Sequence, residues 1–383
     1  MLKQPIYILS NASISALGVD KETVWNNYIQ AKPLFENINS QGIDYPVSKI
    51  PPHLELLLEE VKNSDSKYKH VDRSVIMALF ASRLAIAKLN EKPKDLGINF
   101  GSSRGATELF EKYFDEFNTT GQVSTFTSPA TTLGNISSWV SHDLQTVGPE
   151  ISHSITCSTG LHAVLNGIAW LQAEMSDCFL VGASEAPLTP FTLAQLTALK
   201  VYSKYQDDYP NKTLDFAKKQ NTLVLGEAAS AFVLSKNKSN AIAKIKGIGY
   251  ATEVLSSGTS ISTDALCFQK SMQMAIGSAN PSTIDAIIMH APGTIQGDIT
   301  EMEAIKKVFG AQLPLLTSNK WLVGHTFATS GLLSMEMALQ MLEHQHFISS
   351  PFYKQEMLQP LQRVLINAVG FGGNAVSVIV ELV

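Results

Sequence analysis

Short apolar runs alternate with longer amphipathic stretches along almost the whole chain. Runs such as CFLVGAS (178–184), IDAIIMH (284–290) and NAVSVIVELV (374–383) are nearly continuous in apolar residues, which is typical of strands buried on both faces. Between such runs lie segments with helical spacing, among them DRSVIMALFASRLAIAKL (72–89) and TEMEAIKKVF (300–309). This alternation predicts an α/β fold in which helices cover the faces of a sheet.

The remaining elements are predicted from the same two patterns, short apolar runs for strands and helical spacing for helices. Further strands are expected at PIYIL, GINFGSS, EISHSIT, AASAFVLS, AIAKIKGIGYA, LPLLTS and RVLINAV, and further helices at KETVWNNYI, ATELFEKYFDEF, LGNISSWVSHDL and residues 262–278. Residues 200–222 show neither period and are rich in polar and aromatic side chains. We therefore expect a long surface loop there, of the kind that often carries function.

Two apolar helices share one sequence pattern. The segments CSTGLHAVLNGIAWL (157–171) and ATSGLLSMEMALQML (328–342) both begin with three small residues followed by Gly-Leu. Both are apolar on all faces, which predicts burial. Two unrelated core helices would satisfy this pattern, and the pattern alone favours that interpretation. If it marks an internal repeat, Cys157 occupies the place that Ala328 takes in the second copy.

Composition narrows the class of protein. The chain has 383 residues, of which 45% are hydrophobic and 16% charged, enough for one large domain or two medium ones. The net charge of −5 argues against a global nucleic-acid-binding surface. No apolar run reaches the ~18 residues of a membrane span, and the first residues are too polar for a secretory signal. Three cysteines without a CxxC pair argue against disulfides and a thiolate zinc site, so we expect a cytoplasmic protein that binds no metal.

Cys157 stands where the predicted strand EISHSIT gives way to a predicted helix. The amides and the dipole at a helix N-terminus favour the thiolate, which is the nucleophilic form of cysteine. The three small residues that follow leave room for a substrate. Judged alone, the residue fits a small buried hydrophobic side chain slightly better than a nucleophile. Cys178 and Cys267 fit that buried role more closely.

Two of the nine histidines, His290 and His325, lie in turns at predicted strand ends, where α/β folds build active sites. The glycine-rich segment GFGGN (370–374) links the last two strands. Its glycines allow positive φ and a close approach of the backbone, although a tight hairpin would explain them as well. No segment has the spacing of a dinucleotide-binding or P-loop motif, so no nucleotide site is predicted.

Taken together, these segments resemble the β-ketoacyl synthases, the condensing enzymes of the thiolase superfamily. The resemblance covers essentially the whole chain, and the motifs occur in the family's order. The segments that carry it are SNASISALG, SPATTLGNISSWV, GPEISHSITCSTG, LDFAKKQNTLVLGEAAS, HAPGTIQGDITEMEAI, SNKWLVGHTFATSGLL and NAVGFGGNAV. Each motif alone is weak, and their combination is specific.

The resemblance implies a thiolase-like five-layered α-β-α-β-α fold built from two similar halves. Residues 1–240 would form the half that carries the nucleophile and an inserted cap or loop region. Residues 241–383 would form the half that carries both catalytic histidines. The resemblance also implies Cys-His-His catalysis, which separates the chain from thiolases and from the Cys-His-Asn branch of initiating synthases.

By this resemblance, Cys157 attacks an acyl thioester and carries the acyl chain on its sulfur. The N–H groups of Cys157 and Phe371 form the oxyanion hole, and Phe371 gates the pocket. His290 and His325 hydrogen-bond the malonyl thioester carbonyl and stabilise the enolate that forms as carbon dioxide leaves. Lys320 holds the polar network around the histidines. The other implied site residues are Asp298 and Glu301, as ion-pair partners of Lys320, and Thr294, Gly372 and Gly373, in substrate binding.

Departures from the family pattern point to a specialised synthase. HAPGT stands in place of the usual HGTGT, so Pro292 replaces a threonine that would touch the pantetheine arm, while Thr294 remains. Ser334 takes the place of a frequent glutamate, and Asn374 replaces the threonine of the usual GFGGTN. The stretches SSRGATE and HAPGT are similar to synthases of bacterial aryl-polyene or flexirubin pigment clusters.

The resemblance implies no metal and no diffusible cofactor, because the substrates are thioesters on the phosphopantetheine arm of acyl carrier protein. That carrier is acidic, so a local basic patch is expected around residues 200–222, although a solvated charged loop explains the same residues equally well. The candidates are Lys200, Lys204, Lys212, Lys218 and Lys219. A homodimer, or a heterodimer with a chain-length-factor-like subunit, is expected, without nucleic acid or a membrane span.

The expected function is that of a β-ketoacyl-[acyl carrier protein] synthase, acting by decarboxylative Claisen condensation in polyene, polyketide or specialised fatty acid biosynthesis. Two alternatives stay open: a non-catalytic chain-length-factor-like subunit and a thiol acyltransferase. Chain-length factors commonly lack the cysteine, and two histidines suited to decarboxylation argue against a simple acyltransferase.

Overall fold

The computed structural model describes residues 2, 4–93, 95–132, 135–254 and 262–383. Its main sheet contains every strand expected from the sequence, with ends shifted by a few residues. The strands are β1 (Ile6–Ile14), β4 (Leu96–Gly101), β5 (Glu150–His153), β6 (Cys178–Glu185), β8 (Ala228–Ser235), β9 (Ala243–Thr252), β10 (Ala286–Ile288), β11 (Leu315–Thr317), β12 (Val364–Gly370) and β13 (Asn374–Leu382). Their order across the sheet is β11-β10-β12-β13-β9-β1-β8-β6-β4-β5.

The strand order repeats itself on the two sides of this sheet. Strands β1-β8-β6-β4-β5 form one half and β9-β13-β12-β10-β11 the other. From the shared centre outward, the successive pairings in both halves are antiparallel, antiparallel, parallel and parallel. Strands β1 and β9 join the halves along one antiparallel ladder. The pattern shared by residues 157–171 and 328–342 therefore belongs to an internal repeat, and the interpretation as two unrelated helices is wrong.

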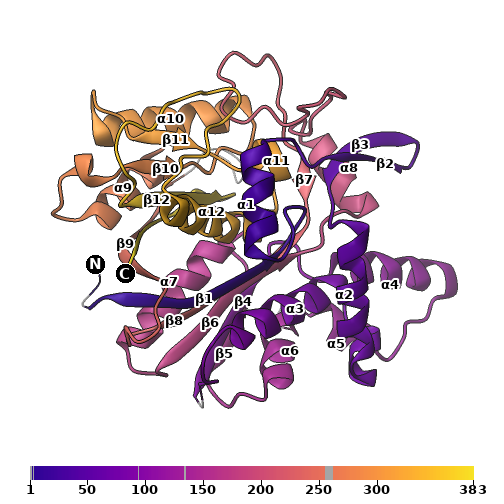
Figure 1. The fold of residues 1–383 in the computed structure, drawn as a ribbon. Coiled ribbons are helices and arrows are strands. Elements are labelled where there is room, and N and C mark those ends of the chain that lie inside the picture. The colour runs from indigo at the N-terminus through magenta and orange to yellow at the C-terminus, as the bar shows by residue number, and fades with distance from the viewer. Residues whose placement is uncertain (1, 3, 94, 133–134, 255–261) are drawn as a thin grey trace.

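Helices cover both faces of each half. They are α1 (Lys21–Gln30), α2 (Pro52–Asn63), α3 (Arg73–Ala87), α4 (Thr107–Thr120), α5 (Thr127–Thr131), α6 (Asn135–Leu144), α7 (Thr159–Gln172), α8 (Pro190–Ala198), α9 (Leu266–Ile276), α10 (Ile295–Phe309), α11 (Lys320–Val323) and α12 (Ser330–His344). Helices α3 and α6 pack outside the first half, and α9, with α10 against it, packs outside the second (Figure 1). Helices α7 and α12 lie between the halves and contact each other, which completes five layers. Residues 133 and 134 of the helix expected at LGNISSWVSHDL lie outside the described residues.

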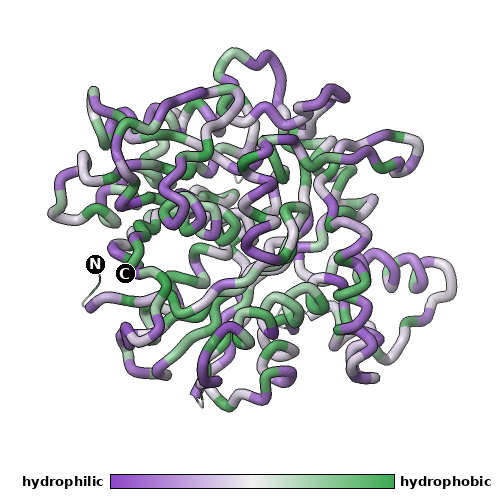
Figure 2. The backbone as a smooth tube through the Cα atoms, in the orientation of Figure 1, coloured by the Kyte–Doolittle hydropathy of each residue, from purple (hydrophilic) through white to green (hydrophobic). Residues whose placement is uncertain are grey.

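The two central helices approach closely because each has a glycine at the same place in the repeat. A Cβ on Gly160 would lie 2.5 Å from the carbonyl oxygen of Ala328. A Cβ on Gly331 would lie 2.6 Å from Cγ of Leu161. Side chains of α7, α12 and both halves of the sheet share one hydrophobic core, and hydrophobic positions gather along these central elements (Figure 2). The repeat thus brings the starts of α7 and α12 together at the centre of the molecule.

The structure also contains elements that the sequence did not predict. Strands β2 (Glu36–Ser40), β3 (Ile43–Ser48) and β7 (Leu225–Gly226) form a separate small sheet. Helices α2 and α8 were likewise not expected. Within the described residues, no helix combines the length and the apolar character needed to cross a membrane.

Residues 200–222 have no helix and no regular strand, but the expectation that they form a surface loop is wrong for much of the segment. Asn211, Thr213 and Leu214 are completely buried. The N–H of Thr222 donates to the carbonyl oxygen of Gly293 at 2.9 Å, in the turn that follows β10. The Thr222 hydroxyl also donates to this oxygen, at 2.8 Å. Polar side chains of this segment thus satisfy the backbone of an interior turn, so the segment is buried although it lacks an apolar period.

Candidate active site

Cys157 lies between β5 and the first turn of α7, as the sequence predicts. The residue before it, Thr156, has a φ of +46°, a left-handed conformation that is uncommon for a threonine. The Cys157 side chain is only 6% exposed, and it lines a cavity of about 530 Å³. Other residues that line this cavity are Arg104, Leu196, Leu199, Phe327 and Phe371. The sulfur is therefore buried in the wall of a cavity large enough for a small acyl group.

Burial sets the protonation state of this cysteine. It raises the pKa of the Cys157 thiol to about 12, and the buried carboxylate of Glu185 adds to the rise. The Lys320 cation and the amide of Cys157 itself oppose the rise without cancelling it. The expectation that the helix terminus produces a thiolate is thus wrong for the resting site, because desolvation outweighs the dipole. The thiol must lose its proton as it reacts.

The turn between β12 and β13 brings Phe371 to the same cavity. Phe371 is 44% exposed and forms part of the cavity wall. A Cβ on Gly370 would lie 2.6 Å from the carbonyl oxygen of Ile155 and 3.3 Å from the amide nitrogen of Cys157. Only a glycine lets the turn lie this close to the cysteine backbone. Gly372 and Gly373 complete the turn with φ values of +97° and +69°.

His290 and His325 form a buried pair. Their ring centroids lie 5.3 Å apart, and the ring planes are nearly perpendicular, at 81°. Burial lowers the pKa of both imidazoles well below the ordinary value, and the Lys320 cation lowers it further. Both rings are therefore neutral at neutral pH, and each has a single N–H to donate.

Phe327 connects the histidine pair to the cysteine cavity. Its ring centroid lies 5.5 Å from that of His325, and its side chain lines the cavity together with Cys157. Cys157 and Phe327 also belong to one apolar cluster. The charge of Lys320 acts on Cys157 and on both histidines. Chemically active residues from the two halves of the repeat thus share one buried region.

Two carboxylates on α10, Asp298 and Glu301, hold the turn that carries His290. Glu301 accepts hydrogen bonds from the backbone N–H of His290 at 2.9 Å and of Ala291 at 2.8 Å. Asp298 accepts one from the N–H of Gly293 at 3.0 Å. Because these residues are one helical turn apart, both face the 290–293 turn and fix its backbone.

The expected pairing of these carboxylates with Lys320 is wrong. Asp298 forms a completely buried ion pair with Lys218, at 2.6 Å, and none of the ion pairs among the described residues includes Lys320. Asp298 and Glu301 raise the pKa of Lys320 only from a distance, and burial still lowers it overall. The assignment of Lys218 to a surface basic patch is wrong for the same reason: its side chain is used inside the protein.

Thr294 begins helix α10. Its Oγ1 accepts a hydrogen bond from the N–H of Gly297 at 3.1 Å, so the hydroxyl caps the helix. The contacts of Thr294, Gly372 and Gly373 with a substrate stay predictions.

Ser330, which the sequence did not single out, controls the surroundings of His325. Its Oγ lies 2.9 Å from His325 Nδ1 and accepts the N–H of Thr326 at 3.1 Å. It also lies 3.3 Å from the hydroxyl oxygen of Thr326. If Ser330 donates its one hydrogen to Nδ1, the Ser330 oxygen can accept both the N–H and the O–H of Thr326. The hydrogen-bond network therefore favours the His325 tautomer with its hydrogen on Nε2.

Replacement of this hydroxyl is expected to disturb the tautomer. In Ser330→Ala, ¹⁵N NMR of labelled histidine should show His325 losing its preference for hydrogen on Nε2. If the chain follows the mechanism that the resemblance implies, the decarboxylation rate should fall about tenfold to hundredfold, while acylation of Cys157 changes little. Ser330→Thr, which keeps a hydroxyl, should restore both signals. Ser334→Ala, one turn further along α12 and equally buried, is the control. An unchanged tautomer in Ser330→Ala would contradict the assignment.

Several residues of this region escaped the sequence-based prediction. Glu185 is completely buried at the end of β6, and burial raises its pKa to about 7. A carboxylate ending an otherwise apolar strand was the available signal. Arg104 follows β4 among small residues, which was a weaker one. Asn367, which donates to Glu301 at 3.0 Å, lies inside an apolar strand. Among the described residues, no cluster of histidine, cysteine and carboxylate side chains could hold a metal ion.

Comparisons with known proteins agree with this geometry. The chain is 26% identical, over 97% of its length and 97% of the relative, to 3-oxoacyl-[acyl-carrier-protein] synthase 2 of Staphylococcus aureus (strain COL). It is similar in fold to a chain of the ishigamide ketosynthase/chain length factor, with a TM-score of 0.86, 18% identity and 99% of each chain covered. It is also similar to a chain of AntDE:AntF, a type II PKS acyl-carrier protein in complex with its ketosynthase, with a TM-score of 0.84, 19% identity and the same coverage.

The doubled five-layer arrangement is the thiolase-like fold. The model of the Beta-ketoacyl synthase N-terminal domain matches residues 3–240, and that of the Beta-ketoacyl synthase C-terminal domain matches residues 242–351. The chain belongs to the β-ketoacyl synthase family, and it is an acyltransferase-type condensing enzyme.

Proposed function

We propose that the chain catalyses decarboxylative condensation between an acyl group held on Cys157 and a malonyl group carried by acyl carrier protein. One observation carries the proposal: a cysteine in the wall of an open cavity lies in the same buried region as two neutral imidazoles from the other half of the repeat. Each half supplies what the other lacks, a nucleophile on one side and two neutral hydrogen-bond donors on the other.

In the first step, the sulfur of Cys157 attacks the carbonyl carbon of an acyl thioester. The new bond joins that carbon to Cys157, the bond to the carrier sulfur breaks, and the thiol proton ends on the released carrier thiol. The backbone N–H groups of Cys157 and Phe371 stabilise the negative oxygen in between, each worth about 3 kcal/mol. The close approach of Gly370 to the Cys157 amide supports this role.

In the second step, the malonyl thioester loses carbon dioxide. The electron pair of the broken carbon–carbon bond passes into an enolate, whose oxygen accepts the N–H groups of His290 and His325. Because both rings are neutral, they donate hydrogen bonds without giving up a proton to the carboxylate. The enolate carbon then attacks the acyl carbon on Cys157. A carbon–carbon bond forms, the Cys157 sulfur leaves, and it regains a proton.

The other site residues have supporting roles in this proposal. Lys320 places a positive charge beside the cysteine and both histidines. Glu301 and Asp298 fix the turn that aims His290. Phe371, exposed at the cavity, opens and closes access to Cys157. Thr294, Gly372 and Gly373 would border the phosphopantetheine arm, and no metal or diffusible cofactor takes part.

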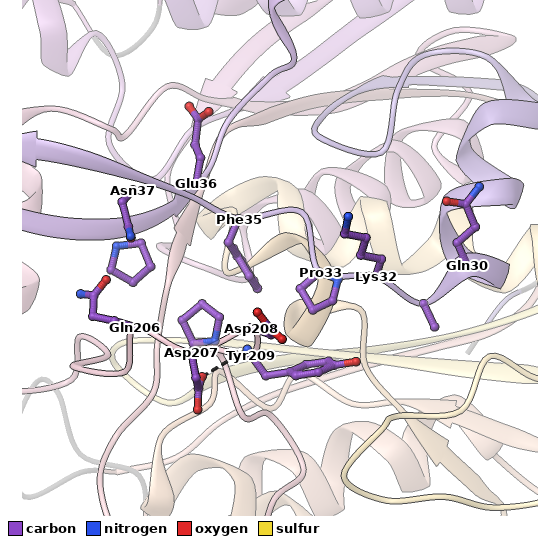
Figure 3. Close-up of a pocket in the computed structure, with 13 residues that line it drawn as sticks. Gln30, Lys32, Pro33, Phe35, Glu36, Asn37, Gln206, Asp207, Asp208 and Tyr209 are labelled. Carbon is purple, nitrogen blue, oxygen red and sulfur yellow. Dashed lines mark hydrogen bonds between the residues drawn. The ribbon is translucent and has the colours of Figure 1, made fainter.

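We assign carrier binding to the exposed lysines of the 200–222 segment, Lys200, Lys204 and Lys219. Lys212 is half-buried and paired with Asp207 at 2.8 Å. Asp207 and Asp208 line a pocket together with Tyr209, residues 30–33 and residues 35–37, so that end of the segment is unsuited to an acidic partner (Figure 3). The similar AntDE:AntF structure, an acyl-carrier protein with its ketosynthase, supports a carrier as partner.

A second subunit would pair along β5. This strand lies at the edge of the main sheet, and Ile151 on it is 41% exposed. In the same half, α4 exposes Phe110, Phe114 and Phe117. The partner would be a second copy or a chain-length-factor-like subunit, as the ishigamide relative supports. We place the reaction in polyene, polyketide or specialised fatty acid synthesis in the cytoplasm, where the three free cysteines stay reduced.

Incubation with acyl- and malonyl-carrier protein separates the candidate functions. The proposal requires carbon dioxide release and a product two carbons longer than the starting acyl group. Release of a free acid, or transfer of the acyl group without carbon dioxide, would identify a thiol acyltransferase instead. No acyl-enzyme and no product, in the presence of the native partner, would identify a chain-length-factor-like subunit.

A further inference from the structure

Arg104 is a positively charged residue in the wall of the Cys157 cavity. It lies in the turn after β4, and its side chain is half-buried. Its Nη2 donates to the side-chain oxygen of Gln195 and, at 3.4 Å, to the hydroxyl of Thr192, both on α8. These contacts hold the guanidinium in one place at the cavity wall.

One buried donor of this guanidinium has no acceptor within the described chain. The Nε of Arg104 is buried and has no hydrogen-bond partner among the described residues. The ion pairs found in the described part of the chain do not include Arg104. The nearby buried carboxylate of Glu185 instead accepts the backbone N–H groups of Ser103 and Ala328. The other oxygen of Glu185, Oε2, is also buried without a hydrogen-bond partner among the described residues. No described side chain therefore accepts the Arg104 Nε–H or forms an ion pair with this guanidinium beside the nucleophile.

The rest of the cavity wall is largely apolar. Leu196, Leu199, Phe327 and Phe371 line it together with Arg104. A hydrocarbon chain on Cys157 would displace water from this cavity without giving the half-buried guanidinium an acceptor, which is unfavourable. A chain that carries an oxygen atom could fill the same space and accept this hydrogen bond. Charge-assisted hydrogen bonds of this kind are also stronger than neutral ones.

We propose that Arg104 makes the Cys157 cavity selective for acyl thioesters whose chain carries an oxygen acceptor, such as a ketone. This inference rests on the proposed function, because it concerns the acyl group that Cys157 receives. Arg104 acts in recognition only, so the bonds made and broken in acyl transfer stay the same. The substrate class is then a partly oxygenated chain, and a saturated hydrocarbon chain is the poorer substrate.

The test compares acyl groups of equal length. Hexanoyl, 3-oxohexanoyl and 5-oxohexanoyl pantetheine thioesters are offered to the whole protein, and the mass of the Cys157 adduct is followed over time. In the wild type, one of the oxo chains should acylate Cys157 with a kcat/KM at least about tenfold above that of hexanoyl. In Arg104→Met, which keeps an unbranched side chain without the donors, this preference should disappear while hexanoyl acylation stays the same or rises.

Lys246→Met is the matched control, since it removes one exposed positive charge from β9, away from the cavity. It should leave the preference unchanged. Equal rates for all three thioesters in the wild type would overturn the inference. An equal loss of rate with all three thioesters in Arg104→Met would also overturn it. That result would mean that Arg104 stabilises the negative charge on the Cys157 sulfur and does not recognise the acyl chain. In both cases, a hexanoyl adduct that condenses with malonyl-carrier protein would leave the proposed function standing.

Discussion

Cys157→Ala is expected to abolish the acyl-enzyme. In the proposed mechanism, this substitution removes the atom that carries the acyl group, so condensation should fall by at least ~10⁴-fold. The fold should survive, because the sulfur lies in a cavity wall and its loss leaves no new closed void. We expect a midpoint of thermal unfolding within about 4 °C of the wild type. Intact-protein mass spectrometry after incubation with an acyl thioester measures the first effect, and calorimetry the second.

Cys267→Ala provides the matched control for this experiment. Cys267 is completely buried in α9, where burial raises its pKa to about 12, as at Cys157, but it does not line the cysteine cavity. This variant should still form the acyl-enzyme at the wild-type rate. Peptide mapping that located the acyl group on a residue other than Cys157 would refute the assignment of the nucleophile.

His290→Ala is expected to separate the two chemical steps. Acylation of Cys157 should continue within about threefold of the wild-type rate. Decarboxylation should fall by ~10²–10³-fold, the usual cost of losing one donor to a developing oxyanion. His290 suits this role because its ring is neutral, and its Nδ1 is buried without a hydrogen-bond partner among the described residues. Adduct mass and labelled carbon dioxide, measured in parallel, report the two steps.

His53→Ala, at an exposed position on α2, controls for the loss of an imidazole as such. It should leave both steps intact. If His290→Ala instead slowed acylation most, the histidine would act on the cysteine, and the roles proposed for the two residues would have to change.

The helices and strands that carry the site were largely predictable. Cys157 was placed correctly at a strand-to-helix junction, because a β-branched run, a cysteine and an apolar helical stretch follow directly in the chain. The turn at residues 370–374 was predicted from its glycines. At Gly370 the structure leaves no room for a side chain. Local pattern was sufficient in these places because each feature depends on neighbouring residues.

Predictions that depended on distant contacts were less successful. Lys218 looked like one surface lysine among several, but it is the buried partner of Asp298, eighty positions along the chain. The thiolate expected from the start of α7 was outweighed by burial, whose extent depends on packing around the whole cavity. The unmatched donor of Arg104 arises only when α8 packs beside the turn after β4.

By itself, the sequence determined the alternation of strands and helices, the buried character of the two central helices, and the residue types available for catalysis. These follow from hydrophobic period and side-chain chemistry, which are local properties. The tertiary structure alone decided which charges pair, which groups lose water, and which donors stay unmatched beside Cys157. Those outcomes depend on distances and desolvation between residues far apart in the chain, and no period along the sequence encodes them.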